Sequence, residues 1–488
     1  MLTKVDWRRL CGSRLNWVMA LKLERSMKLS HSLLLVVLFL ISFSSLTVAD
    51  AKPVFFLKNG DRVCFYGDSI TEQRFYPADV QTYVLTRFPK LHVRFVDAGV
   101  GGDRVTGGWA GTINVRLKRD VYPFKPNVVT IMLGMNDASY RPFNEEIFNV
   151  YKKGYEHIIR ALKRHLPGVH IVLLGTSPYD DVTHKVGFPG GYNAVLIRYN
   201  KFVQHLAAKN HLMYVDFNTP MVKVLKAANK INPTLAKQFF PGRVHPSAAA
   251  EMMMAQALLK AWGAPATVTN VAINAASDSL THAINTSITG LKSTHGTLTW
   301  TQLDGSLPMP VIALHENWPQ FPSWNLFLPP QPNPRYTNPA TALIDKLSGF
   351  THQLDREMLT VKGLSAANYK LLIDGKTIGQ FTARRLSSGI NLSRYFTPML
   401  RQAYYVNNIV WEEIQAHFVA WHGVQTMMEN YGWSKPNMPV TTENDPAARR
   451  SVARVVRAMN QLINVIMAHE YAANQPVPHH YELIPIGG

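Results

Sequence analysis

Between residues 54 and 265, short apolar segments alternate with longer helix-like segments, and this alternation limits the possible folds more than any other feature. Apolar runs of this kind are typical of strands buried on both faces, and intervening helices allow neighbouring strands to run parallel. The pattern predicts an α/β fold in which a central parallel sheet lies between two layers of helices. The expected strands are residues 62–66, 92–96, 128–133, 170–174 and 213–216, and the expected helices are residues 80–88, 144–166 and 194–209.

The pattern changes after Pro265. A chain of 488 residues is too long for one typical hydrophobic core, so two or three domains are expected. Alternating apolar residues predict strands in residues 268–310, and Asp374-Gly375 predicts a hairpin turn within residues 358–381. Helical patterns follow over residues 398–429 and 445–471. The chain is therefore divided into an α/β domain, a β-rich region and a helical C-terminal region, at residues 52–265, 266–390 and 391–488.

The N-terminal segment has the pattern of a secretory signal peptide. From Met27 a lysine precedes the apolar residues 33–41, and small residues around Ala51 offer a cleavage site. Residues 1–51 are thus predicted to be a signal peptide with an upstream extension, and either Met1 or Met27 could be the true start. The alternative is a retained anchor, because the apolar stretch approaches the length that spans a bilayer. Export predicts a secreted or periplasmic protein without stable membrane insertion after cleavage.

The composition is that of a basic globular protein, with 51 Lys and Arg against 32 Asp and Glu and a formal net charge of +19. The basic residues are scattered and match no nucleic-acid-binding motif, so we expect no nucleic-acid partner. Cys11 lies in the segment expected to be removed, which leaves Cys64 without a partner for an internal disulfide. His184 lies in a segment whose spacing fits no metal motif, and neither a metal nor another cofactor is expected.

Four short polar or glycine-rich segments fall where expected strands end or near the end of the α/β unit. In open α/β sheets, ligands bind beyond the carboxyl ends of the strands. A serine at a strand-to-helix turn, glycines that expose backbone N–H groups, an asparagine amide and a histidine are the groups that acyl transfer requires. The segments are Gly67-Asp68-Ser69-Ile70-Thr71, Asp97-Ala-Gly99-Val-Gly101-Gly102-Asp103, Gly134-Met135-Asn136-Asp137 and Val244-His245-Pro246.

Together the four segments resemble the motif blocks of SGNH/GDSL hydrolases, a family of esterases and lipases with a flavodoxin-like three-layer fold. The resemblance covers residues 54–265 and rests on GDSITEQ, AGVGGD, GMND and the final histidine. It implies that Ser69 is the nucleophile and His245 its base. It also implies that Gly102 and Asn136 join the Ser69 N–H as donors to the oxyanion.

One position departs from the family pattern. The last block of the family normally reads Asp-x-x-His, whereas this chain has Gly242 three residues before His245. Loss of the carboxylate from a serine triad can lower kcat by about 10⁴. Three explanations are open: a backbone carbonyl near Gly242 orients the histidine, Asp216 replaces the missing carboxylate, or the site is degraded and binds without cleaving.

These observations favour a secreted serine carboxylester hydrolase that removes short acyl groups, such as acetyl, from a polysaccharide or small-molecule ester. Acyl-chain lipids are the second substrate class. The alternative is a non-catalytic glycan-binding protein on the same fold, which Gly242 motivates. Asp68 and Asp137 are interpreted as hydrogen-bond partners of the turns, and Trp109 as a half-buried structural side chain or a pocket wall.

Overall fold

The computed structural model describes residues 54–311, 339–426 and 446–487. Residues Phe55–Gly488 form one compact unit. The predicted signal peptide lies outside the described residues, and so does most of the proline-rich stretch before residue 339. Within the described ranges, no helix combines the length and the apolar character needed to cross a membrane.

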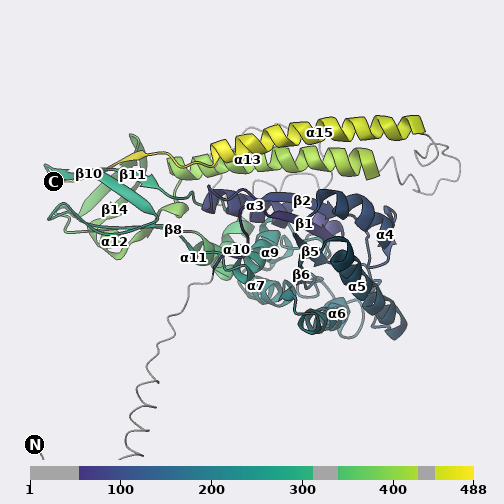
Figure 1. The fold of residues 1–488 in the computed structure, drawn as a ribbon. Helices are drawn as coiled ribbons and strands as arrows, with labels where there is room; N and C mark the ends of the chain where they lie inside the picture. Colours follow the sequence, from purple (N-terminus) through teal and green to yellow (C-terminus); the bar gives the residue numbers. More distant parts are fainter. Residues whose placement is uncertain (1–53, 312–338, 427–445, 488) are drawn as a thin grey trace, which may run out of the picture. The chain divides into compact units, whose positions relative to one another are not determined.

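A parallel five-stranded sheet forms the centre of the predicted α/β domain, as the sequence predicted (Figure 1). Its strand order is β2-β1-β5-β6-β7, so the order reverses beside β1, where the crevice for a ligand is expected. Strand β2 starts at Arg94, two residues later than the predicted start at residue 92. The strands are β1 (Arg62–Gly67), β2 (Arg94–Gly99), β5 (Val128–Met132), β6 (His170–Leu174) and β7 (Met213–Val215).

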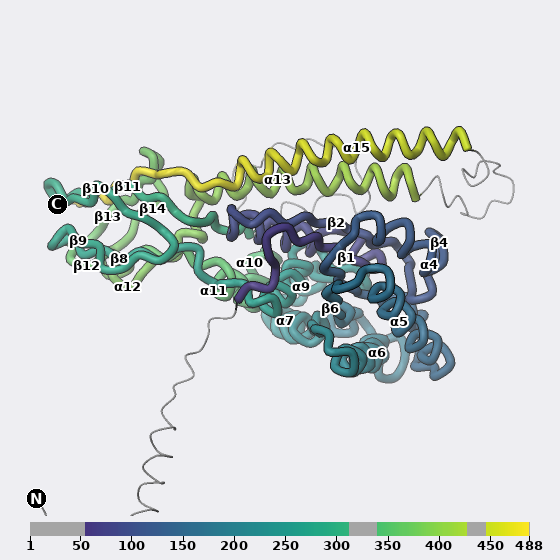
Figure 2. Tube along the Cα trace, viewed as in Figure 1, coloured from purple at the N-terminus to yellow at the C-terminus, as the bar shows by residue number. Residues whose placement is uncertain are grey.

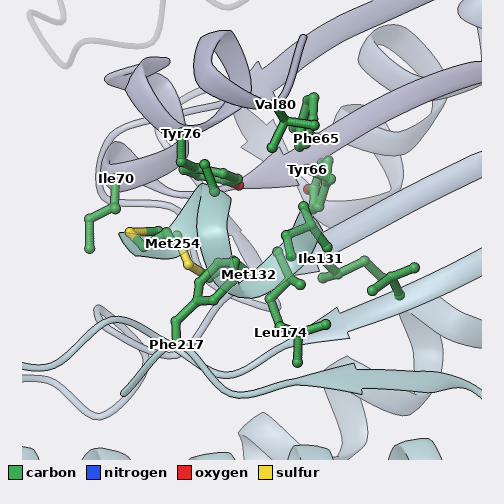
Figure 3. Close-up of a cluster of buried hydrophobic side chains, with 14 of the residues drawn as sticks. Phe65, Tyr66, Ile70, Tyr76, Val80, Ile131, Met132, Leu174, Phe217 and Met254 are labelled. Carbon is green, nitrogen blue, oxygen red and sulfur yellow. The ribbon is translucent and has the colours of Figure 1, made fainter. Parts of the chain in front are cut away.

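Helices flank the sheet and bury its apolar side chains (Figure 1). Figure 3 shows part of this core, where Phe65 and Tyr66 of β1 lie near Ile131 and Met132 of β5. The main helices are α3 (Phe75–Arg87), α5 (Glu145–His165), α6 (Gly191–Lys209), α7 (Asn218–Ile231) and α9 (Ala248–Ala261). Short elements connect them, namely α2 (Ser69–Glu72), β3 (Gly107–Gly108), β4 (Gly111–Thr112), α4 (Ile113–Arg116), η2 (Leu117–Val121), η3 (Tyr122–Phe124) and α8 (Pro233–Lys237).

The β-rich region contains two sheets, with strand orders β10-β11-β16-β13-β14 and β15-β12-β8-β9. Asp374 and Gly375 turn between β13 and β14 with φ of 49° and 71°, the positive values that a tight two-residue hairpin needs. Its strands are β8 (Thr267–Asn274), β9 (Ser279–Ile284), β10 (Thr286–Thr294), β11 (Thr297–Asp304), β12 (Arg356–Lys362), β13 (Asn368–Ile373), β14 (Lys376–Thr382) and β15 (Ile390–Asn391). Its helices are α10 (Pro339–Ser348), α11 (Phe350–Leu354) and α12 (Ala383–Ser388).

The C-terminal region is helical except for its end. It comprises η4 (Leu392–Arg394), α13 (Pro398–Phe418), the π-helical η5 (Val419–Thr426), α15 (Pro446–Ala473) and the strand β16 (His479–Pro485). The prediction of a purely helical region misses β16, which pairs with both β11 and β13 and whose buried alternate residues Tyr481 and Leu483 join the β-sheet core.

Helices α13 and α15 lie side by side, and α13 packs on α3 of the α/β domain (Figures 1 and 2). Thr397 caps α13 by accepting a hydrogen bond from the Leu400 N–H at 3.1 Å. The rings of Phe75 on α3 and Trp411 on α13 lie 5.8 Å apart in a shared apolar core. The C-terminal region therefore covers one face of α3, which is the first long helix after Ser69.

Candidate active site

Ser69 begins α2 directly beyond the end of β1. Asp68 caps this short helix, because its Oδ1 accepts a hydrogen bond from the Ile70 N–H at 3.0 Å. Burial raises the pKa of Asp68 to about 8, so the carboxyl group is largely protonated at neutral pH while it caps the turn. Gly67 is required for the tight turn: a Cβ there would overlap the Thr71 hydroxyl and lie 2.9 Å from the Met132 carbonyl oxygen. Ser69 itself stays half-buried at the rim of the sheet.

His245 reaches Ser69 from the loop before α9. Its Nε2 lies 2.8 Å from Ser69 Oγ, which is hydrogen-bond distance for a base and its nucleophile. The Gln73 amide links α2 to the same loop by donating to the Pro246 carbonyl oxygen at 3.2 Å. Burial lowers the pKa of His245, while the charge of Glu72 acts in the opposite direction. A neutral imidazole at neutral pH is the form that accepts a proton.

Gly102 and Asn136 lie on the two loops that follow β2 and β5. Gly102 has a φ of 76°, and a Cβ added there would meet no heavy atom of the described residues within 4 Å. The Asn136 amide donates to the Asp103 carbonyl oxygen at 3.1 Å and accepts from the Tyr140 hydroxyl at 2.9 Å. One of its two N–H groups therefore remains to bind an oxyanion. The roles predicted for both residues stay predictions.

Buried polar contacts fix the loop that carries Gly102. The Arg116 guanidinium donates to Asp103 Oδ2 at 2.8 Å, to the Ala98 carbonyl oxygen at 2.8 Å and to Asp120. Asp137, interpreted as a hydrogen-bond partner of its own turn, instead accepts a bond from the Val105 N–H at 2.9 Å and so links its turn to the loop that carries Gly102. The donors predicted for the oxyanion are thus held by a rigid, desolvated framework.

Neither group considered for orienting His245 contacts it. Gly242 is exposed, and Asp216 instead caps the start of α7, where its Oδ1 accepts from the N–H groups of Asn218 and Thr219 at 2.9 and 3.1 Å. Over the described part of the chain, the bond to Ser69 is the hydrogen bond that His245 makes. Which group orients this histidine stays a prediction.

Two side chains at this site, Glu72 and His422, were not predicted from the sequence. Glu72 Oε1 lies 2.7 Å from His422 Nε2 of η5, an ion pair when the histidine is protonated. Trp109 lies beside them: its indole N–H donates to the Gly101 carbonyl oxygen at 2.9 Å, and its ring is 5.6 Å from that of His422. Glu72 follows Ser69 by one helical turn, which was a usable signal, whereas nothing local marks His422.

A metal site is not evident in the ranges that the structure describes, where no three His, Cys, Asp or Glu side chains are grouped to hold an ion. His184 lies 3.0 Å from Asp180 Oδ2, and the same carboxylate group accepts from the Val182 and Thr183 N–H groups. His184 is thus part of a hydrogen-bonded loop.

Comparisons with known proteins bear on the same residues. Residues 65–251 match the model of the GDSL-like lipase/acylhydrolase family. The chain is 29% identical over 224 residues to an acetylxylan esterase of Geobacillus stearothermophilus, an alignment that covers 42% of this chain and 95% of that protein. The structure of a gut microbial diltiazem-metabolizing enzyme is similar at a TM-score of 0.74 and 26% identity, and covers 89% of this chain and 100% of that one. This similarity extends beyond the α/β domain into the regions that follow it.

Proposed function

We propose that this chain, an ester-hydrolysing enzyme of the GDSL-like lipase/acylhydrolase family, removes short acyl groups such as acetyl from carbohydrate. The observation that carries the catalytic part is the 2.8 Å contact between His245 Nε2 and Ser69 Oγ at the carboxyl edge of the sheet. The similarity to an acetylxylan esterase supports the substrate class.

The proposed reaction passes through an acyl-enzyme. Ser69 Oγ attacks the ester carbonyl carbon while its proton moves to His245 Nε2. The Ser69 and Gly102 N–H groups and the Asn136 amide donate hydrogen bonds to the tetrahedral oxyanion. The intermediate collapses, the C–O bond to the alcohol breaks, and His245 gives its proton to the departing oxygen. Water, deprotonated by His245, then attacks the acyl-serine. The bond between the acyl carbon and Ser69 Oγ breaks, His245 returns its proton to Ser69 Oγ, and the carboxylic acid is released.

Tyr140 offers a surface for the alcohol part of the substrate. Its hydroxyl is bonded to Asn136, its ring stacks on that of Tyr192 at 5.0 Å, and 44% of the residue is exposed. Ser139 and Tyr140 both have positive φ, 59° and 53°, a strained backbone that holds the ring in place beside the proposed oxyanion donor. A fixed aromatic face suits the apolar C–H face of a sugar ring.

Hydrolysis of a short aryl acetate by the full chain, beside Ser69→Ala, tests the reaction. Turnover by the wild type and its loss in the alanine variant support the proposal. Acetylated xylan and its oligosaccharides then test the substrate class. For these, Tyr140→Ala should raise KM several-fold while KM for the small aryl acetate changes little. An equal change for both substrates would argue against a sugar-binding role of Tyr140.

A glycan-binding protein without activity is the competing function, and Gly242 is the residue that favours it. It predicts that wild type and Ser69→Ala bind acetylated glycan alike and that neither releases acetate. Release of acetate by the wild type alone excludes it.

We also propose that the enzyme acts outside the cytoplasm after removal of residues 1–51. The lysine and apolar run after Met27 support this proposal. N-terminal sequencing of the protein isolated from the periplasm or the medium tests it. A chain that begins near residue 52 agrees with it, and a full-length chain in the membrane fraction contradicts it.

A further inference from the structure

The missing carboxylate at Gly242 leaves His245 without the partner that usually stabilises its protonated form. We infer that Glu72, held in place by His422 of the C-terminal region, supplies the negative charge that the His245 imidazolium requires. Glu72 is thus a positioning residue that acts through His245. The inference rests on the proposed function, because it concerns the base of that reaction.

The Glu72 carboxylate lies beside the nucleophile. Glu72 follows Ser69 by one turn of α2, so both side chains project from the same side of this short helix. A Cβ added at Gly101 would lie 2.8 Å from Glu72 Oε2 and 3.9 Å from Ser69 Cβ. The carboxylate therefore occupies the space beside the nucleophile that the glycine leaves open.

His422 lies against this carboxylate in a poorly hydrated place. The side chains of His422 and Glu72 are only 14% and 16% exposed, and their facing atoms are 2.7 Å apart, at ion-pair distance without hydrogen-bond alignment. The imidazole also stacks on the Phe418 ring at 4.6 Å and meets Trp109 edge-on. A charge that is largely removed from water acts more strongly on a neighbouring charge than an exposed one.

The C-terminal segment is anchored by contacts that lie just before His422. Arg74 donates to the Glu72 carbonyl oxygen at 3.0 Å and to Gln415 Oε1 at 3.1 Å, and its guanidinium lies 4.0 Å from the centre of the Phe418 ring. One residue before His422, the Trp421 indole N–H donates to Asp120 Oδ1 at 2.8 Å. These contacts tie the end of α13 to Glu72 through Arg74, and the start of η5 to η2.

The charge of Glu72 acts electrostatically on His245. Burial lowers the pKa of His245, and the Glu72 charge raises it. Proton transfer from Ser69 creates an imidazolium, so a carboxylate that favours this form lowers the barrier to attack. Asp216, the carboxylate considered from the sequence, is occupied in capping α7.

The test compares the full-length wild type with Glu72→Gln, Gly242→Asp and the double variant, with Glu156→Gln on α5 as a matched control. Two quantities are measured: the titration of His245 by NMR of histidine-labelled protein, assigned with His245→Gln, and the pH profile of kcat/KM for an aryl acetate. The Gly242 site accepts the aspartate, because an added Cβ meets no heavy atom of the described residues within 4 Å and the backbone φ is not positive. Circular dichroism checks that each variant folds.

Glu72→Gln should lower the pKa of His245 by about 0.5 to 1 unit. This change is at the low end of the pKa shifts that a nearby opposite charge causes. The same variant should lower kcat/KM by roughly 10- to 100-fold, within the size of loss seen when a triad carboxylate is removed. Gly242→Asp should restore most of this loss in the Glu72→Gln background and change the wild type little.

An unchanged His245 titration in folded Glu72→Gln would overturn the inference, whatever its activity. So would a loss of activity that Glu156→Gln shares. If the wild type shows no Ser69-dependent turnover, the proposed function fails, but the NMR titration still decides whether Glu72 acts on His245. The two failures are therefore distinguishable.

Discussion

Replacing Arg116 with Met should destabilise the protein by about 3–5 kcal/mol, the range for breaking a buried ion pair from one side. The Arg116 side chain is fully buried and pairs with Asp103 and Asp120, whose side chains are equally inaccessible to water. Methionine matches the length of the arginine stem but leaves these acids without their main partner. Arg119 still pairs with Asp120, so the penalty falls mainly on Asp103.

The same substitution should reach the active site. Asp103 follows Gly102, and its carbonyl oxygen accepts the hydrogen bond that holds Asn136. Movement of this loop displaces two of the three proposed oxyanion donors. At temperatures where the variant is still folded, kcat should fall by about 10²-fold or more, as when an oxyanion donor is lost.

Urea unfolding followed by circular dichroism measures the change in stability, with Arg160→Met as the control. Arg160 forms an exposed pair with Glu156 on α5, and its loss should change stability by less than about 0.5 kcal/mol. If Arg116→Met unfolds within about 1 kcal/mol of the control, the cluster does not hold the loop and the reasoning is refuted.

Three other predictions concern single positions. Asn136→Ala should lower kcat for an aryl acetate by about 10²- to 10³-fold, and an unchanged kcat would remove Asn136 from the oxyanion site. Gly67→Ala should destabilise the fold by about 1–3 kcal/mol in chemical unfolding, because its Cβ has no room against Thr71 and Met132, whereas Gly242→Ala at an open position should not. Glu413 faces Gln81 and Glu470 where α13 meets α3. Burial raises the pKa of Glu413 to about 7. The folded state therefore keeps a proton that the unfolded chain releases at lower pH, so stability should fall as the pH rises from about 4.5 to about 7. Thermal unfolding should show a smaller loss of stability over this range in Glu413→Gln. The same pH dependence in wild type and variant would contradict this assignment.

The fold of the α/β domain was predictable because its strands are continuous apolar runs, such as Val128–Met132, separated by helices of ordinary length. Boundaries were less accurate where packing overrides local pattern. Helix α3 starts at Phe75 and not at residue 80, because its first turn is buried against the C-terminal helices and α9. Strand β16 was missed because a short segment after a long helix carries no signal for pairing with strands more than a hundred residues earlier.

At the site, the sequence located Ser69 and His245, and the structure brings them within hydrogen-bond distance. Each lies in a motif whose spacing is local. The contact of Glu72 with His422 depends instead on how α13 packs on α3 and continues into η5, which is a tertiary property.

Covalent labelling of Ser69 tests the central claim most directly. The full chain is treated with a fluorophosphonate, which reacts with serines activated by a neighbouring base, and the modified peptide is identified by mass spectrometry. The account predicts one label per chain, on the peptide containing Ser69, with labelling abolished in Ser69→Ala and strongly slowed in His245→Gln. Absence of labelling in the folded wild type, or equal labelling of the His245 variant, would contradict the Ser69–His245 assignment.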